Sequence, residues 1–149
     1  MQDTKQIISN LLTNIRTDVI NSLQSSGRYA TGETISQLEI ALRDEGGKLL
    51  APWWIDALEK GRKPTSQGAP LGDPPMIERI KAWCAAKGID TAAAWAIKKS
   101  IDKYGYPGKP GVLTQPLEDA DKHIDAALNE IATNYQNEIV DLFKVFDEI

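Results

Sequence analysis

The carboxylates best placed for chemistry are Asp56 and Glu59, three residues apart in a segment that follows two tryptophans. If this segment makes two helical turns, the spacing puts both carboxylates on one face. Paired carboxylates act as acid and base in glycosidases, but such a site also needs further polar groups that converge on the pair, and the sequence shows none. The other interpretation is a solvated surface, with Glu59 pairing with Arg62. We expect no enzyme, and a small hydrolase that uses Asp56 and Glu59 stays as an alternative.

The single histidine and the single cysteine do not complete a reactive site. His123 lies among charged residues near the C-terminus, as a surface residue or a pH-sensitive contact. A zinc site requires three or four ligands, which one histidine and one distant cysteine do not supply. Cys84 falls on the apolar side of a predicted helix, which favours a buried side chain over a nucleophile. The sequence therefore predicts no catalytic, metal-binding or cofactor-binding residue.

Charge is unevenly distributed along the 149 residues. Residues 46–115 hold 11 basic and 6 acidic residues, a net charge of +5, whereas residues 116–149 hold 2 basic and 9 acidic residues, a net charge of −7. A basic patch is typical of nucleic-acid binding, but no helix-turn-helix, RNP or zinc-finger pattern accompanies this one. We favour a patch that faces protein. Direct DNA contact is not favoured, and a nucleic-acid-binding accessory protein stays as a second alternative.

Hydrophobic periodicity predicts the elements that position these groups. Apolar residues recur at steps of three and four in residues 4–25, which predicts an N-terminal helix within residues 1–26. Alternation in residues 38–42 and a turn at residues 44–47 predict a β-hairpin. Two strands alone are marginally stable, so the hairpin must pack on helices or gain strands from a neighbour.

Two further helices are predicted between loops rich in proline and glycine. The first begins near Pro75 and ends at Gly88, and the second follows Asp90 or Thr91 and ends at Gly105. Their expected apolar faces are Ile77, Ile80, Trp83 and Cys84 in the first, and Ala94, Ile97, Ile101 and Tyr104 in the second. Residues expected to shape turns are Gly61, Pro64, Gly88 and Gly105.

The four tryptophans are divided between core and surface. We expect Trp83 and one of the neighbours Trp53 and Trp54 in the core. Trp95 falls off the apolar stripe of its helix, so we expect it at an interface, where exposed tryptophans are enriched.

Residues 117–149 predict one long acidic helix. Its apolar positions step by four and three residues: Ile124, Leu128, Ile131, Tyr135, Ile139, Leu142, Phe146 and Ile149. About thirty helical residues reach about 45 Å, beyond the span of a compact domain of this size. We expect part of this helix to pack on the N-terminal helix and part on another subunit. The elements together predict a single α+β domain, residues 1–149, in which a small antiparallel hairpin-based sheet packs on helices and residues 30–115 form the α+β core.

The motifs in residues 30–115 occur in a recognisable order. The hairpin is followed by L-E-x-G-R-x-P at residues 58–64, a Pro/Gly loop, a helix with I-x-x-W at residues 80–83 and K-G-I at residues 87–89, and a helix that closes with Y-G-x-x-G at residues 104–108. This order resembles the tail-completion and head–tail joining proteins of tailed bacteriophages, also called minor tail or virion morphogenesis proteins. The long acidic helix matches no motif of that family.

The resemblance implies a structural virion protein of the neck, head–tail connection or tail completion, with no catalysis and no cofactor. Expected partners are further copies in an oligomeric ring that forms on a template, and other neck, portal-side or tail proteins. No apolar run is long enough to span a membrane, so no membrane partner is expected. The expected location is the virion, and the host cytoplasm during assembly.

Contacts in a ring are head-to-tail, so two different faces of each subunit must complement each other. We predict that the basic middle of one subunit faces the acidic C-terminal helix of the next. The residues predicted for this contact are Arg62, Lys63, Trp95, Lys98, Lys99, Asp121, Asp125 and Glu130.

Overall fold

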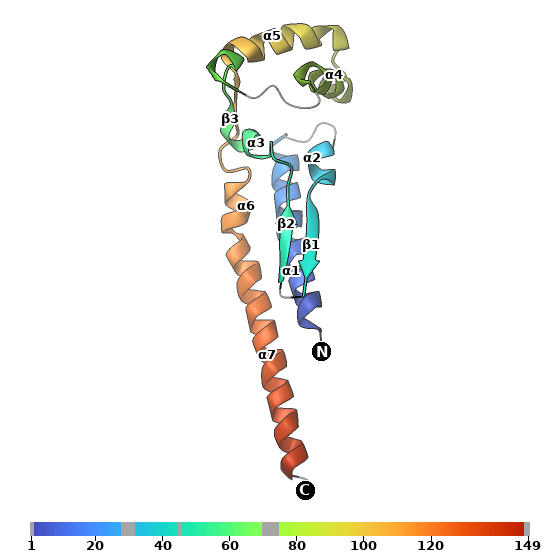
Figure 1. The fold of residues 1–149 in the computed structure, drawn as a ribbon, viewed down its shortest axis with the longest axis vertical. Coiled ribbons are helices and arrows are strands. Elements are labelled where there is room, and N and C mark those ends of the chain that lie inside the picture. The colour runs from blue at the N-terminus through green and yellow to red at the C-terminus, as the bar shows by residue number, and fades with distance from the viewer. Residues whose placement is uncertain (1, 28–31, 45, 70–74, 148–149) are drawn as a thin grey trace.

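A computed structural model describes residues 2–27, 32–44, 46–69 and 75–147. The molecule is elongated, with a central body, a head at one end and a long helix that projects from the other end (Figure 1). The architecture is α+β, as predicted: a hairpin packs on long terminal helices, and a second, very short two-stranded sheet connects body and head.

The N-terminal helix α1, Thr4–Ser25, is the centre of the body and has the bounds that its periodicity predicts. It buries Ile15, Val19 and Leu23 of the predicted apolar stripe, and it buries Ile7 where the stripe had placed Ile8. The main cluster of the body consists of Val19, Leu23, Leu38, Val112 and Leu113. Two of these residues follow the head in sequence, so the chain leaves the body, builds the head and returns.

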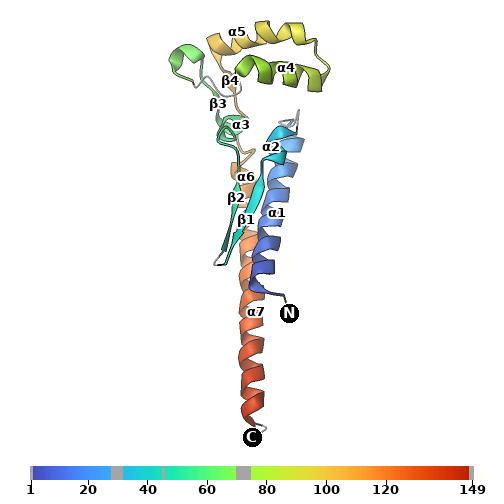
Figure 2. The same ribbon diagram turned by 45° about the vertical axis from the view of Figure 1, so that its right-hand side comes forward.

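The predicted hairpin lies beside α1 and is confirmed. Strand β1, Glu39–Arg43, pairs antiparallel with β2, Gly46–Leu50, after the short helix α2, Glu33–Ser36. A side chain added at Gly47 would press on Leu12 of α1, so the hairpin lies directly against the helix (Figure 2). The helix thereby covers one side of a sheet that would be marginal alone.

The neck of the molecule, which is the connection between the body and the head, follows the hairpin. The segment after the two tryptophans, where the sequence favours a short helix or turn, forms the short helix α3, Asp56–Lys60. Directly after it, β3, Gly61–Arg62, pairs antiparallel with β4, Tyr106–Pro107. The two connections between body and head are thus hydrogen-bonded to each other.

The head lies across the long axis of the molecule (Figures 1 and 2). Its elements are η1, Thr65–Gln67; α4, Met76–Lys87; η2, Thr91–Ala93; and α5, Ala94–Tyr104. Asp90 caps η2 by accepting a hydrogen bond from the amide of Ala92, as expected. A separate small cluster of Ile80, Cys84 and Ala94 is the core of the head.

Two aromatic residues predicted in the apolar faces of the head are outside its core. Trp83 is 39% exposed and Tyr104 is 68% exposed. The core between α4 and α5 is filled by smaller side chains, so neither large ring enters it. Of the adjacent pair, Trp54 is half-buried beneath the guanidinium of Arg79, 4.2 Å from the ring centre, and Trp53 is exposed.

The C-terminal region begins with α6, Thr114–Glu118, and continues as α7, Ala120–Asp147. The first part of α7 packs on α1, and its second part extends beyond the N-terminal end of α1 (Figures 1 and 2). The predicted long C-terminal helix is confirmed; it begins at Ala120, three residues after the predicted start, and the short helix α6 precedes it. The predicted packing of part of the helix on the N-terminal helix is confirmed.

Candidate assembly interface

Three glycines make the close approach at the neck possible. Gly61 has φ +81° and Gly105 has φ +67°, values that disfavour any side chain. A Cβ at Gly61 would overlap the carbonyl oxygen of Tyr106, and one at Gly105 would overlap that of Arg62. A Cβ at Gly108 would likewise overlap the carbonyl oxygen of Glu59. The motifs at residues 58–64 and 104–108 therefore form one joint.

Glu59 has a structural role in this joint. Its Oε2 accepts hydrogen bonds from the amides of Leu113 and Thr114, both 2.7 Å away, and its Oε1 accepts one from the hydroxyl of Thr114. The carboxylate thus caps the N-terminus of α6, where amides lack partners and negative charge is favoured. The hydrogen bonds from Thr114 and then Leu113 lower the pKa of Glu59.

Asp56 and Glu59 are therefore engaged separately. Asp56 forms an exposed ion pair with Lys60, at 3.1 Å, while Glu59 holds α6. Sequence reasoning missed the partner of Glu59 because Thr114 lies 55 positions away. Arg62, the partner expected for Glu59, donates instead to the carbonyl of Lys63 and to the hydroxyl of Thr65, both at 3.2 Å.

A polar network continues from Arg62 into the head. The hydroxyl of Thr65 donates to Asp102 at 2.5 Å, and the ammonium of Lys98 contacts the other carboxylate oxygen at 2.5 Å. The hydrogen bond from Lys98, followed by that from Thr65, lowers the pKa of Asp102. Arg62 and Lys98, both predicted at a subunit interface, thus also join η1 to α5 within the chain. The four-residue spacing of Lys98 and Asp102 on a helix could have indicated this pair, whereas Thr65 lies 37 positions from Asp102.

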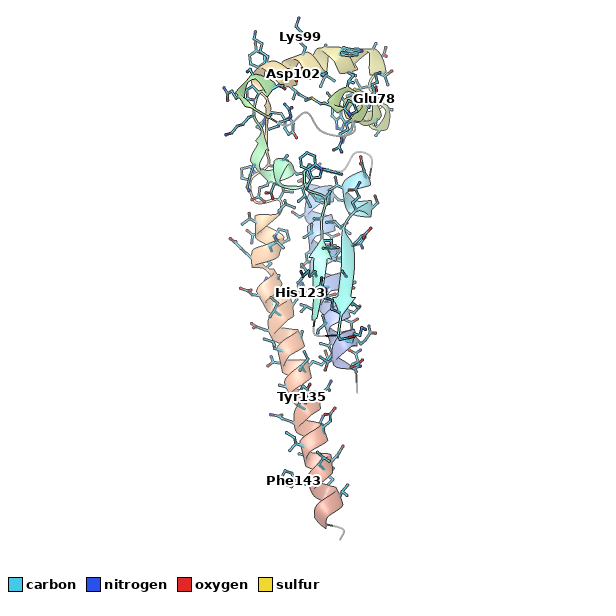
Figure 3. All side chains as sticks on the ribbon, in the orientation of Figure 1. Glu78, Lys99, Asp102, His123, Tyr135 and Phe143 are labelled. Carbon is cyan, nitrogen blue, oxygen red and sulfur yellow. The ribbon has the colours of Figure 1, made fainter. Side chains whose placement is uncertain are left out.

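The outer face of α5 is basic and aromatic. Trp95, Lys99 and Lys103 are four residues apart and so share a side of the helix. Trp95 is 60% exposed, as expected for an interface residue, and Lys99 lies on the side of α5 away from the body (Figure 3). Lys103 approaches the exposed ring of Tyr104 at 4.8 Å. Lys63 is exposed in the loop before η1. The surface formed by Trp95, Lys99 and Lys103, here called the α5 face, combines positive charge with exposed apolar area.

The acidic residues predicted for the complementary face are all exposed on α7. At 100° per residue, Asp121 and Asp125 share a side of the helix, whereas Glu130 lies on roughly the opposite side. The structure therefore brings the first two together and separates the third from them. They lie on the other side of the neck from the α5 face (Figure 1). The basic surface therefore belongs to the head and the acidic surface to the body, so the two do not contact each other within one chain.

Apolar side chains of α7 are exposed along its length. Those more than half exposed are Leu128, Tyr135, Ile139, Val140, Leu142, Phe143 and Val145. The packing on α1 instead buries Ala120 and Ala127. Figure 3 shows Tyr135 and Phe143 on the part of α7 beyond α1. Phe146 and Ile149, also predicted on the apolar stripe, lie outside the side chains that the structure describes.

A depression lined mostly by polar residue types lies between α1, α6 and the start of α7. It has a volume of about 580 Å³, and Ser22, Gln115 and Lys122 are among its lining residues. His123 contacts Asp18 of α1 across this seam, 2.7 Å from Nε2 to the carboxylate. The sole histidine therefore links two helices, which the local sequence did not reveal.

Within the residues described, no helix is long and apolar enough to cross a membrane. The same residues contain no group of three or more histidine, cysteine, aspartate or glutamate side chains arranged to hold a metal ion. Comparisons with protein-family models, with curated proteins and with solved structures gave no match to this chain.

Proposed function

We propose that this chain is a structural virion protein of a tailed bacteriophage, which acts as one subunit of an oligomeric ring in the neck, the head–tail connection or the completed tail. The observation that carries the proposal is the exposed apolar surface of α7, which no described part of the chain covers. A contiguous exposed apolar surface is typical of an interaction site.

The distribution of charge supports contacts between different faces of neighbouring subunits. Lys99 and Lys103 lie on the α5 face, whereas Asp121 and Asp125 lie on α7. A head-to-tail contact in a ring joins two such unlike surfaces. We assign the α5 face of one subunit and the acidic start of α7 in the next to this contact.

The assignment to tailed phages rests on the resemblance of the motifs, and the joint gives those motifs a physical role. Gly61, Gly105 and Gly108 allow two chain segments to approach, and Glu59 ties α6 to them. A hydrogen-bonded joint between head and body suits a subunit that presents two separate contact surfaces. Other neck, portal-side or tail proteins are the further partners under this proposal.

The charge contact is tested by native mass spectrometry and light scattering of the full chain. Reversing two charges on the α5 face, Lys99→Glu with Lys103→Glu, should shift the distribution toward smaller species, and so should raising the salt concentration. Adding Asp121→Lys with Asp125→Lys should restore the larger species. Lys48→Glu, an exposed change on the hairpin, is the control. Equal masses for all these variants would contradict the contact.

The place in the virion is tested separately. The proposal predicts peptides of this chain in purified virions and labelled copies at the neck or tail end in electron micrographs. Its absence from virions that contain every other neck and tail protein would refute the proposed function, whatever the protein does in isolation.

A further inference from the structure

Strand β1, Glu39–Arg43, forms an open edge of the hairpin. Among the residues that the structure describes, β1 pairs only with β2, so the main-chain groups of alternate β1 residues point away from the hairpin. In Figure 1, β2 lies between β1 and the α6–α7 side of the molecule, which leaves β1 on the outer side. Such an edge is a template for pairing with another strand.

The composition of β1 favours pairing, and that of β2 does not. The central residues of β1, 40–42, are isoleucine, alanine and leucine, with no charge and no proline. β2 instead has Lys48 at its centre and begins with two glycines. A lysine in the middle of an edge strand and glycines within it both discourage the addition of a further strand. The edge of β1 is therefore the one that accepts a new strand.

The five residues of β1 are complementary to a second copy of themselves. Two β1 strands can run antiparallel with Ala41 of one chain opposite Ala41 of the second copy. Glu39 of each chain then lies opposite Arg43 of the other, and Ile40 lies opposite Leu42. Opposite charges and apolar side chains that face each other across two strands stabilise an antiparallel pair. No other antiparallel register places Glu39 opposite Arg43.

The surroundings of β1 fit this register. A twofold axis perpendicular to the sheet between the two alanines keeps both α1 helices on the same face of the combined sheet. The two hairpins are displaced by two strand spacings, about 10 Å, which is about the width of one helix, so each keeps room for its own α1. The carbonyl of Leu38 accepts a hydrogen bond from Arg16 at 2.7 Å, so the new ladder begins at Glu39.

We propose that two copies of this chain form a dimer through their β1 strands, which pair antiparallel about Ala41 into one four-stranded sheet. The partner at this edge is a second copy, because β1 matches its own sequence in both charge and apolar character. The inference goes beyond the proposed ring. The contact is twofold, and it uses neither the α5 face nor α7.

Charge reversals in the full chain test the pairing, with the dissociation constant of the dimer measured by analytical ultracentrifugation. Glu39→Arg and Arg43→Glu each place like charges opposite each other twice, so each should raise the dissociation constant at least about tenfold. A mixture of the two variants should form a heterodimer as tight as the original dimer, because opposite charges then meet at both ends. Lys48→Glu is the control and should change nothing, since Lys48 pairs with Ala41, midway between the two charged positions.

The outcomes of this experiment are decisive in both directions. Glu39 and Arg43 are exposed in the single chain, so the fold should remain in both variants, as checked by circular dichroism. Restored affinity in the mixture establishes that the two positions face each other. An original chain that stays monomeric up to its solubility limit, or a mixture that is as weak as each variant alone, would overturn the pairing.

Cysteine cross-linking tests the register. Ala41→Cys places the two thiols opposite each other, with Cβ atoms about 4.5–5.5 Å apart. Lys48→Cys lies on the same face one strand further from the axis, so its two copies are about 14 Å apart. The native Cys84 is completely buried and does not compete in the folded protein. Under mild oxidation, Ala41→Cys should give at least about tenfold more disulfide-linked dimer than Lys48→Cys. Equal yields, or no dimer from Ala41→Cys, would overturn the register.

The strand pairing and the proposed function fail independently. If the α5 charge reversals dissociate the larger species while the β1 variants leave every mass unchanged, the strand pairing is wrong and the ring proposal stands. If the β1 variants behave as expected but the protein is missing from virions, the strand pairing stands and the phage function is wrong.

Discussion

At the scale of single residues, Glu59 illustrates how a side chain that resembles a catalytic group is used for structure. Its carboxylate accepts three hydrogen bonds from Leu113 and Thr114 and so fixes the start of α6. Glu59→Gln should lower the free energy of unfolding by about 1 kcal/mol, the usual contribution of a helix cap. Urea denaturation at neutral pH measures the change.

The control is Asp56→Asn on the same helix. Its ion pair with Lys60 is exposed, so removal should change stability by less than about 0.5 kcal/mol. An equal loss in both variants would mean that Glu59 contributes through surface charge and not through the cap.

The lowered pKa values of Glu59 and Asp102 predict the direction of the pH dependence. A carboxyl whose folded pKa is below its unfolded pKa stabilises the fold above the unfolded value, and this stability is lost as pH falls through the folded value. Acidification below about pH 4 should therefore destabilise the protein. Glu59→Gln with Asp102→Asn should make that loss shallower. Unfolding curves at several pH values measure it, and an unchanged slope would contradict the assignment.

What the sequence revealed about individual residues depended on whether the partner is close in sequence. The exposure of Trp95 was predictable from helical periodicity. The pairing of His123 with Asp18 and the cap formed by Glu59 were not, because the partners lie 105 and about 55 positions away. Such pairs form only because the chain returns from the head to the body, and local sequence patterns do not predict that return.

At the scale of elements, the glycine joint gives a sharp comparison. Gly105→Ala places a methyl group against the backbone of Arg62 at φ +67°, whereas Gly88→Ala at φ +71° meets no atom within 4 Å. Gly88→Ala carries the left-handed backbone cost of about 1–2 kcal/mol. Gly105, with φ +67° and ψ −161°, lies in a backbone region that is essentially restricted to glycine. Gly105→Ala should be more destabilising, because backbone must also move, and thermal unfolding of the two variants measures the difference. Equal losses would show that the neck adjusts freely.

Elements with a clear period were predicted well, and those without one were not. α1 repeats over 22 residues and the hairpin alternates around a glycine turn, so local sequence determines both. β3 and β4 have two residues each, too few for any period. Trp83 and Tyr104 fit apolar faces by spacing, but spacing does not report how many large rings the space between α4 and α5 accepts.

At the scale of the whole molecule, the body and the head have separate cores. The body cluster is centred on α1, and the head cluster consists of Ile80, Cys84 and Ala94. The sequence predicted one domain from chain length, and length alone does not show how apolar residues divide between clusters. The question that follows is whether the head opens independently of the body.

Cys84 reports on that question, because it is the single cysteine and is completely buried in the head. The same small change can be made in each part: Ile80→Val in the head and Ile7→Val in α1, both at buried positions. Each should cost about 1 kcal/mol in its own core. A small cluster opens locally at less free energy than global unfolding requires. We therefore expect Ile80→Val to accelerate labelling of Cys84 by a thiol reagent about fivefold under native conditions, and Ile7→Val to leave the labelling rate unchanged while lowering the urea midpoint. If both variants accelerate labelling by the same factor, head and body unfold as one cooperative unit, and the neck transmits the stability of each core to the other.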